Sequence, residues 1–163
     1  MDAYTIIRSK RDSRDYRDQP IPDEAIHRIL QAGRMAGSSK NRQHCLFVVL
    51  KERTRKEELA ACGHFAKHIP SAPLVVAVVL PGPEFDFDAG RAAQNMMLAA
   101  WAEGIASCPV VMHEAECARR VLGLPEGHRV AIAIAFGYPE SPATLSGGIT
   151  RRPLSELVHH ERW

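Results

Sequence analysis

Residues 74–80 read LVVAVVL, and every position in this stretch is apolar. A strand that has one face in water alternates apolar and polar residues, whereas a strand covered on both faces is apolar throughout. The stretch therefore predicts a central strand of a sheet that has helices on both sides. The sequence Pro-Gly-Pro at 81–83 ends this strand, because proline and glycine mark turns. Residues 130–136, VAIAIAF, have the same character and predict a second buried strand.

The rest of the chain predicts helices around these strands. Pro22 suits a first helical turn, the acidic residues at 23–24 suit the positive end of a helix, and apolar residues then recur at helical spacing. No repeat or linker divides the chain, so the pattern predicts one α+β or α/β layered domain over residues 1–163. We expect helices near 2–9, 22–36, 53–62, 88–103 and 114–122, a short one near 153–159, and further strands at 46–50 and 108–112.

Composition narrows the class of protein. The 163 residues include 21 Lys and Arg against 19 Asp and Glu, a net charge of +2. This balance excludes a protein whose main task is to coat nucleic acid. The four cysteines form no CxxC pair and are too few for a disulfide scaffold, which favours a reducing compartment. The charged first 17 residues lack the apolar core of a secretory signal, so we expect a cytoplasmic protein.

Three polar clusters interrupt the apolar pattern. Residues 10–14 place three cations just after a helix, where they can hold a phosphate, although the neighbouring aspartates favour an ordinary solvated surface. Residues 38–43, SSKNRQ, can donate and accept hydrogen bonds at a heteroaromatic edge, and they also suit a plain turn. Gln94 and Asn95 interrupt an apolar helix. An unpaired buried amide costs about 1–3 kcal/mol, so these two residues predict structural hydrogen bonds to the backbone of a neighbouring strand or of a partner subunit.

A metal or nucleophile site is less favoured. Cys62, His64 and His68 are suitable zinc ligands, and His113 and Cys117 lie four apart on a predicted helix. Zinc usually takes four ligands, and no fourth ligand is evident close to the first three. The chain also lacks a G-x-S-x-G elbow, a Walker-type phosphate loop and a G-x-G-x-x-G fingerprint. A zinc-binding module therefore stands only as an alternative.

Taken in chain order, the motifs resemble those of the nitroreductase family, the flavin-dependent oxidoreductases that bind FMN. The family's basic motif has its counterpart in KRDSRDY at 10–16, and its following helix in PIPDE at 20–24 and ILQA at 29–32. Its serine-rich turn corresponds to AGSSKNRQHC at 36–45, and its buried helix to Asp88, Gly90, Gln94, Asn95, Leu98 and Ala100. Later counterparts are LGLPEG at 122–127, FGYP at 136–139 and RRPLSELVH at 151–159. The resemblance covers nearly the whole chain in the right order.

The resemblance implies an α+β fold with a mostly antiparallel sheet flanked by helices, and an intertwined homodimer with FMN at the subunit interface. The helix at 88–103 would form the dimer core, and residues 150–163 would wrap the partner. The implied reaction is hydride transfer from NADH or NADPH through flavin N5 to a nitroaromatic, quinone or similar conjugated acceptor. It requires no metal and no catalytic side chain. The implied FMN-binding residues are Lys10, Arg11, Arg14, Ser38, Ser39, Asn41, Gln43, His64, Lys67, Arg151 and Arg152.

The resemblance also implies a role for each group. Lys10 or Arg11, with Arg151 or Arg152, would hold the phosphate, because a charge near −2 requires several cations. Arg14 would lie at the pyrimidine edge of the flavin, where a fixed cation favours the reduced form. The serine-rich turn would line the ring and the ribityl chain, and His64 and Lys67 would reach the ribityl or the ring edge.

The sequence departs from the family pattern at three places. Asp12 stands where many members have serine, and His44-Cys45 replaces the usual Pro-Trp. The connection after the helix at 88–103 lacks the insertion that covers the flavin in larger members. The missing cover leaves a second interpretation, a flavin-binding protein that stores or senses FMN without turnover.

Overall fold

The computed structural model describes residues 2–142 and 150–163. Its helices are α1 (Ala3–Ser9), α2 (Asp23–Arg34), α3 (Arg53–Ala60), α4 (Asp86–Ala102) and α5 (Ala115–Val121), with 3-10 turns η1 (Ser39–Asn41) and η3 (Leu154–Glu156). Its strands are β1 (Leu46–Leu50), β2 (Leu74–Pro81), β3 (Ala106–Val110) and β4 (His128–Gly137). The turn-rich stretch expected at 143–149 lies outside the described residues.

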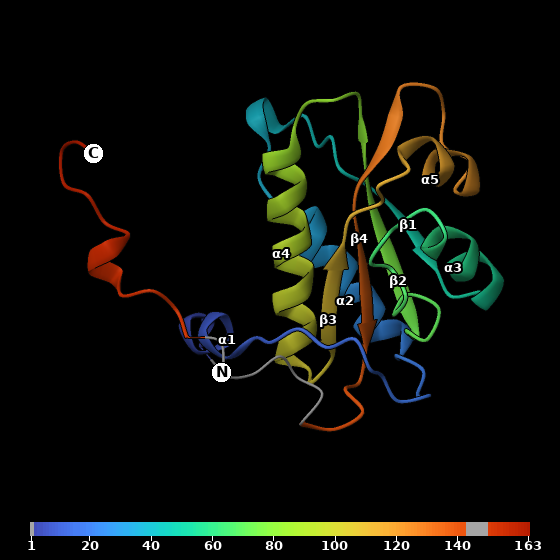
Figure 1. Ribbon diagram of the computed structural model, residues 1–163, viewed down its shortest axis with the longest axis horizontal. Coiled ribbons are helices and arrows are strands. Elements are labelled where there is room, and N and C mark those ends of the chain that lie inside the picture. The colour runs from blue at the N-terminus through green and yellow to red at the C-terminus, as the bar shows by residue number, and fades with distance from the viewer. Residues whose placement is uncertain (1, 143–149) are drawn as a thin grey trace.

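The four strands form one antiparallel sheet in the order β1-β2-β4-β3. The two apolar stretches that predicted buried strands become β2 and β4 and pair with each other at its centre. The α+β fold with an antiparallel sheet is therefore confirmed. Helices α2 and α4 cover one face of the sheet, and α3 and α5 cover the other (Figure 1).

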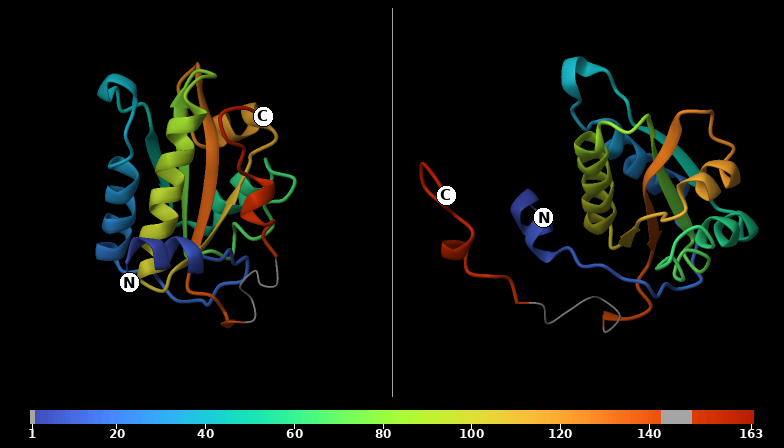
Figure 2. Two further views of the ribbon diagram at one scale, coloured as in Figure 1. Left: turned by 90° about the vertical axis from the view of Figure 1, so that its left-hand side faces the viewer. Right: turned by 45° about the horizontal axis from the view of Figure 1, so that its top comes forward.

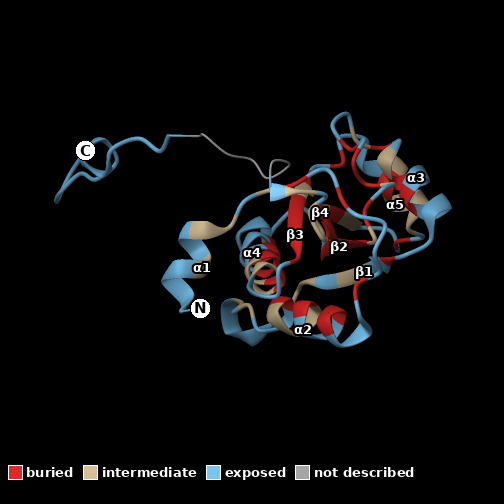
Figure 3. Ribbon diagram, turned by 90° about the horizontal axis from the view of Figure 1, so that it is seen from below, coloured by how far each residue is buried: buried red, intermediate tan, exposed pale blue. Residues whose placement is uncertain are grey.

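Strand β2 shows why a continuous apolar run was needed. Val75, Ala77 and Val79 pack in the core cluster beneath α3 and α5, whereas Val76 and Val78 pack in the cluster beneath α2 and α4. Successive side chains of a strand point to opposite faces, so covering both faces requires apolar residues of both parities. Burial accordingly concentrates on the sheet and the helix faces that touch it (Figure 3).

One predicted boundary is wrong. The third strand runs over Ala106–Val110 and not over residues 108–112. Its pairing with β4 begins at Ala106 opposite Gly137 and ends at Val110 opposite Ala133. The strand therefore starts directly after Ile105, and the chain leaves the sheet before Met112. The short connection from α4 contains no inserted segment.

The two chain ends lie outside the layered body. Helix α1 has no buried residue, and residues 150–163 are exposed throughout. Both ends project on the α4 side of the molecule (Figures 1 and 2). Across the described parts of the chain, no helix combines the length and the apolar character needed to cross a membrane.

Candidate functional site

A pocket of about 670 Å³ joins the two chain ends. It is lined by Tyr4, Ile7, Arg8, Lys10, Arg11, Asp12, Gln94 and Arg151. We call it the chain-end pocket. Helix α1 and the residues after it supply most of its wall, and Arg151 comes from the other end of the chain. Four of its lining residues are cations, and such a set suits a phosphate.

The cations in and near the chain-end pocket differ in their hydrogen-bond partners. Lys10 pairs with Asp12, the acid that stands in place of the family's serine. The Arg11 guanidinium donates to the carbonyl oxygens of Arg8, at 2.9 Å, and of Lys10, at 2.8 Å. Arg152 instead turns away and donates to the Glu156 carboxylate at 3.1 Å. Of the two tail arginines, only Arg151 therefore lines this pocket.

A second pocket, of about 720 Å³, lies further along the same segment. Its lining residues are Arg14, Asp15, His64, Phe65, Lys67, His68 and Ser71. We call it the loop pocket, because most of its wall is the loop between α3 and β2. The segment between the two pockets is hydrogen-bonded to the sheet. The Ser13 N–H donates to the Ser107 carbonyl at 3.2 Å, and Asp12 forms an isolated parallel β-bridge with Ser107 of β3. Three predicted residues, Arg14, His64 and Lys67, thus share one pocket.

Beneath the loop pocket lie buried titratable groups. The Tyr16 hydroxyl donates to the Ser13 carbonyl at 2.5 Å, and burial raises its pKa. Burial lowers the pKa of His68, and the nearby Arg14 cation lowers it further. The Nε2 atom of His68 is buried and has no hydrogen-bond partner among the described residues. Burial favours the neutral form of Tyr16 and His68, so the cations of the loop pocket come from Arg14 and Lys67.

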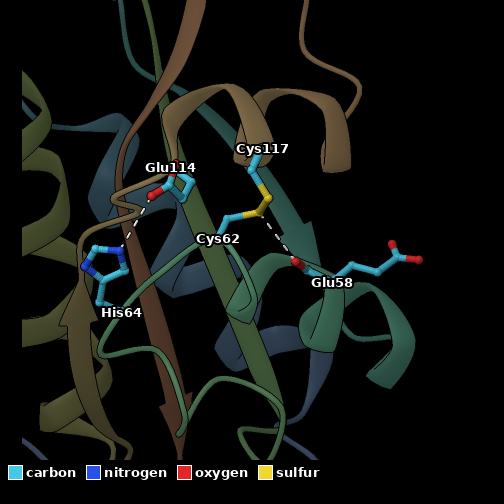
Figure 4. The surroundings of a disulfide bond; sticks show 5 residues. All are labelled: Glu58, Cys62, His64, Glu114 and Cys117. Carbon is cyan, nitrogen blue, oxygen red and sulfur yellow. Dashed lines mark hydrogen bonds and ion pairs between the residues drawn. A yellow bond between two sulfur atoms is a disulfide. The ribbon is translucent and has the colours of Figure 1, made fainter.

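The wall of the loop pocket is fastened to the start of α5. Cys62, just after α3, forms a disulfide with Cys117 of α5, with the two Cα atoms 5.6 Å apart (Figure 4). The His64 and His113 rings stack, with centroids 4.3 Å apart. The cysteine content favoured free thiols, so this pair corrects that expectation. The fold brings together two cysteines that lie 55 residues apart in sequence.

These contacts also account for the residues considered as zinc ligands. Cys62 and Cys117 bond to each other, and His64 pairs with His113 and Glu114. Within residues 2–142 and 150–163, no three His, Cys, Asp or Glu side chains form a group that could hold a metal ion. These cysteine and histidine side chains do come together, but their contacts fasten the loop after α3 to the start of α5. The sequence already singled out His113, whereas the contact of Glu114 with His64 depends on the fold.

The serine-rich turn lies elsewhere in the molecule. Residues 38–43 follow α2 at the end of α4 that is remote from α1 (Figure 1). Arg91 of α4 donates to the Gly37 carbonyl at 2.8 Å, whereas Trp101 of α4 donates to Ser9 at 2.9 Å. Ten residues of helix separate these two anchors, which is about 15 Å at 1.5 Å per residue. The turn is thus remote from α1, and none of Ser38, Ser39, Asn41 and Gln43 lines either pocket of its own chain.

The turn itself has an unusual backbone. Lys40, Asn41 and Gln43 all have positive φ angles, between 52° and 55°. The Ser38 hydroxyl accepts a hydrogen bond from the Gln43 N–H at 2.8 Å, which closes the turn. Non-glycine residues with positive φ cost energy and cluster at functional sites. The exposed Ser39, Asn41 and Gln43 side chains remain available to a ligand.

The two amides of α4 have different environments. Asn95 donates from Nδ2 to the Ala32 carbonyl of α2 at 3.2 Å, a structural role as predicted. Gln94 is exposed and lines the chain-end pocket. Gln94 is therefore not buried within its own chain, because its side chain lies on the face of α4 that α1 borders, and a hydrogen bond to a partner subunit stays a prediction.

The two pockets and the fold define a class of protein. The clustered cations of the chain-end pocket suit a phosphate, and the arginine, lysine and histidine side chains of the loop pocket suit a polar heteroaromatic ring. This arrangement is typical of a protein that binds a phosphorylated aromatic cofactor. The chain belongs to the nitroreductase family: its sequence matches the description of that family over residues 7–81 and 81–138. The family resemblance read from the motifs is confirmed.

The chain is also similar to two oxidoreductases of other organisms. The chain is 29% identical to a protein of Archaeoglobus fulgidus assigned as an NADH dehydrogenase or NAD(P)H nitroreductase, over 99% of each chain. It is 27% identical to the NADPH-flavin oxidoreductase of Vibrio harveyi, over 96% of this chain and 72% of that one.

A solved structure resembles the chain over nearly its full length. A protein of Desulfovibrio desulfuricans, assigned as a nitroreductase and solved in complex with FMN, is 32% identical and superposes with a TM-score of 0.87. The match covers 98% of this chain and 96% of that one. The fold therefore matches that of a protein known to hold FMN.

Proposed function

We propose that the chain is an FMN-dependent oxidoreductase that takes hydride from NADH or NADPH and reduces nitroaromatic, quinone or similar conjugated acceptors. The observation that carries the proposal is that one short segment of the chain lines both pockets. The segment at 10–14 contributes Lys10 and Arg11 to the chain-end pocket and Arg14 to the loop pocket. One phosphorylated ligand can therefore lie along this segment. Bound FMN supplies the hydride chemistry through its N5 atom.

The chain-end pocket is the proposed site of the phosphate. Lys10, Arg11 and Arg151 line it, and fixed cations hold a phosphate dianion through charge-assisted hydrogen bonds. Arg152 is a weaker candidate, because its guanidinium is paired with Glu156. Asp12 opposes an anion by charge, and its pairing with Lys10 offsets that repulsion.

The loop pocket is the proposed site of the ring. Arg14 would face the pyrimidine edge and stabilise the negative charge that a reduced flavin carries there. His64 and Lys67 would contact the ring edge or the ribityl chain. The flavin would carry the hydride chemistry while these side chains supply orientation and charge, so we assign no side chain as a general acid.

A second copy of the chain would complete the site. The turn with Ser38, Ser39, Asn41 and Gln43 lies at the end of α4 remote from α1 and lines neither pocket of its own chain. A homodimer built on α4 would bring the turn of one copy to the pockets of the other. The exposed tail, with apolar Leu154, Leu157 and Trp163, suits wrapping around a partner.

The first test is the visible spectrum of the purified protein, followed by chromatography of the cofactor that heat releases. A flavin spectrum and released FMN are expected, and excess NADH or NADPH should bleach the bound flavin. A colourless protein that does not bind added FMN would refute the proposal. Light scattering tests the homodimer. The cytoplasmic location stays a prediction from the sequence.

One observation favours the second interpretation, a protein that stores or senses FMN. Helix α4 ends at Ala102 and β3 begins at Ala106, so this connection supplies no cover for the flavin. Steady-state assays with a quinone and with a nitroaromatic separate the two functions. Rapid turnover with either acceptor supports the oxidoreductase. Bleaching by NAD(P)H followed by negligible acceptor reduction supports storage or sensing.

A further inference from the structure

The loop at 62–68 is held to the start of α5 by several contacts from one short segment, 113–117. The Cys62–Cys117 disulfide is the covalent contact. The Glu114 N–H donates to the Cys62 carbonyl at 3.0 Å, and the His64 N–H donates to His113 Nδ1 at 3.2 Å. The His64 and His113 rings lie nearly parallel, 7° apart (Figure 4 shows His64 and the disulfide). The whole loop start is therefore fixed through α5.

The noncovalent contacts in this set are weak by themselves. The His64 Nε2 and Glu114 Oε1 atoms are 3.6 Å apart, and both side chains are more than 60% exposed. Exposed ion pairs contribute little, because water screens them. The disulfide is thus the contact whose loss would free the loop most.

The two half-cystine residues differ in exposure. Cys62 is fully buried, whereas Cys117 is partly exposed. Thiol–disulfide exchange requires a thiolate to reach one sulfur, so the more exposed residue, Cys117, is the expected point of attack. The other two cysteines, Cys45 and Cys108, are free thiols and provide matched controls.

We propose that the Cys62–Cys117 disulfide is a redox-sensitive clamp that positions His64 and Lys67 for FMN, so that its reduction weakens FMN binding. The proposal rests on the proposed FMN site. A dithiol supplies the chemistry: its thiolate attacks Cys117 Sγ, the Cys62–Cys117 bond breaks, and a second exchange releases the cyclic disulfide of the reductant. The protein gains two electrons and two protons and ends with two thiols. A small disulfide reverses the reaction and becomes two thiols.

The expected effect is about a tenfold loss of FMN affinity on reduction, which lies within the usual range of coupling between two sites. Coupling is reciprocal, so FMN must also stabilise the disulfide tenfold. For a two-electron couple that factor lowers the disulfide midpoint potential by about 30 mV. A role limited to global stability would not link the two equilibria in native protein.

The experiment compares native protein in its two redox states. FMN and riboflavin are titrated into oxidised protein and into protein reduced with dithiothreitol, desalted and kept anaerobic. Thiol counting after denaturation should give two thiols and then four, because the chain has four cysteines and one disulfide. Both flavins should bind about tenfold more weakly to the reduced protein, because the loop pocket receives the ring that they share. Far-UV circular dichroism verifies that the reduced protein is folded.

Two variants sharpen the comparison. The double variant Cys62→Ser/Cys117→Ser should bind FMN like reduced wild type and should not respond to dithiothreitol. The variant Cys45→Ser should keep the full redox response. Equal affinities in the two redox states, or four thiols after treatment with oxidised glutathione, would overturn the clamp. Absence of FMN binding by the oxidised protein would instead overturn the proposed function.

Discussion

The Nε1 atom of Trp101 donates a hydrogen bond to the Oγ atom of Ser9 across 2.9 Å, joining the last turn of α4 to the end of α1. Helix α1 has no buried residue of its own, so this bond is a main attachment of the segment that carries Lys10 and Arg11. The position of the proposed phosphate ligands therefore depends on a residue of the central helix.

The variant Trp101→Phe should loosen α1. Loss of one hydrogen bond costs about 1 kcal/mol, so FMN should bind roughly fivefold more weakly. Hydrogen exchange of the α1 amides should also accelerate. Ser9→Ala should have the same effect, and the double variant should add nothing to either single change. Additive effects would show that the Ser9–Trp101 bond does not hold α1.

The variant Arg151→Ala should weaken FMN binding and leave riboflavin binding unchanged. Hydrogen bonds to charged groups contribute about 1.5–3 kcal/mol, so a loss of roughly 10- to 100-fold in FMN affinity is expected. Fluorescence titrations with both flavins measure it. Arg152→Ala is the matched control, because Arg152 pairs with Glu156, and its effect should be small. Equal losses for FMN and riboflavin would place Arg151 away from the phosphate.

The variant Arg14→Ala should lower the midpoint potential of the bound flavin as well as its affinity. Removing a cation beside the reduced ring costs on the order of 1.4 kcal/mol in a solvent-exposed pocket, which is about 30 mV for two electrons. Spectroelectrochemistry measures the potential. Arg17→Ala, an exposed cation three residues further on, should leave the potential unchanged. An unaltered potential in Arg14→Ala would refute its placement at the ring.

Acidification should destabilise the fold through His68. Its folded-state pKa lies below the ordinary value of 6.5, so the unfolded chain binds more protons in the window between the two values. The free energy of unfolding should therefore rise with pH across that window, with a slope of at most about 1.4 kcal/mol per pH unit. Urea titrations at several pH values should show a flatter dependence in His68→Gln. The exposed-tail variant His160→Gln should retain the wild-type slope.

The variant Gly137→Ala should destabilise the end of β4. An added Cβ would lie 2.7 Å from Pro73 Cδ and from Tyr16 Cδ1, both parts of rigid rings. Overpacking of this kind costs about 1–3 kcal/mol. Thermal unfolding measures the loss, and Gly137→Ala should cost less in a Tyr16→Ala background than in wild type, because one of the two clashing rings is then absent. A melting temperature equal to wild type would show that this corner has room.

Much of the fold was predictable because its signals are local. The apolar stretch at 74–80 requires cover on two faces, and the structure supplies it with α2 and α4 on one side and α3 and α5 on the other. Strand β1 begins and ends where predicted, at Leu46 and Leu50. The shift of β3 toward its N-terminus was not predictable, since its register depends on pairing with β4.

The residues of the candidate site were predictable from the sequence, but which of them share a pocket was not. The motifs singled out Lys10, Arg14 and Arg151, and the structure adds which pocket each one lines. The choice between Arg151 and Arg152 depended on the Glu156 side chain, which pairs with the second of them. Sequence spacing could not reveal that pairing, because both arginines are equally suited to a phosphate.

The amino-acid sequence by itself determined the layered α+β fold, the family and the residue types suited to a phosphate and a ring, because periodicity, caps and short motifs act over a few residues. Tertiary structure alone decided three things: that Cys62 bonds Cys117, that His64 stacks on His113, and that the turn at 38–43 lines neither pocket. Each depends on which distant segments the sheet and α4 bring together, and no local pattern encodes that distance.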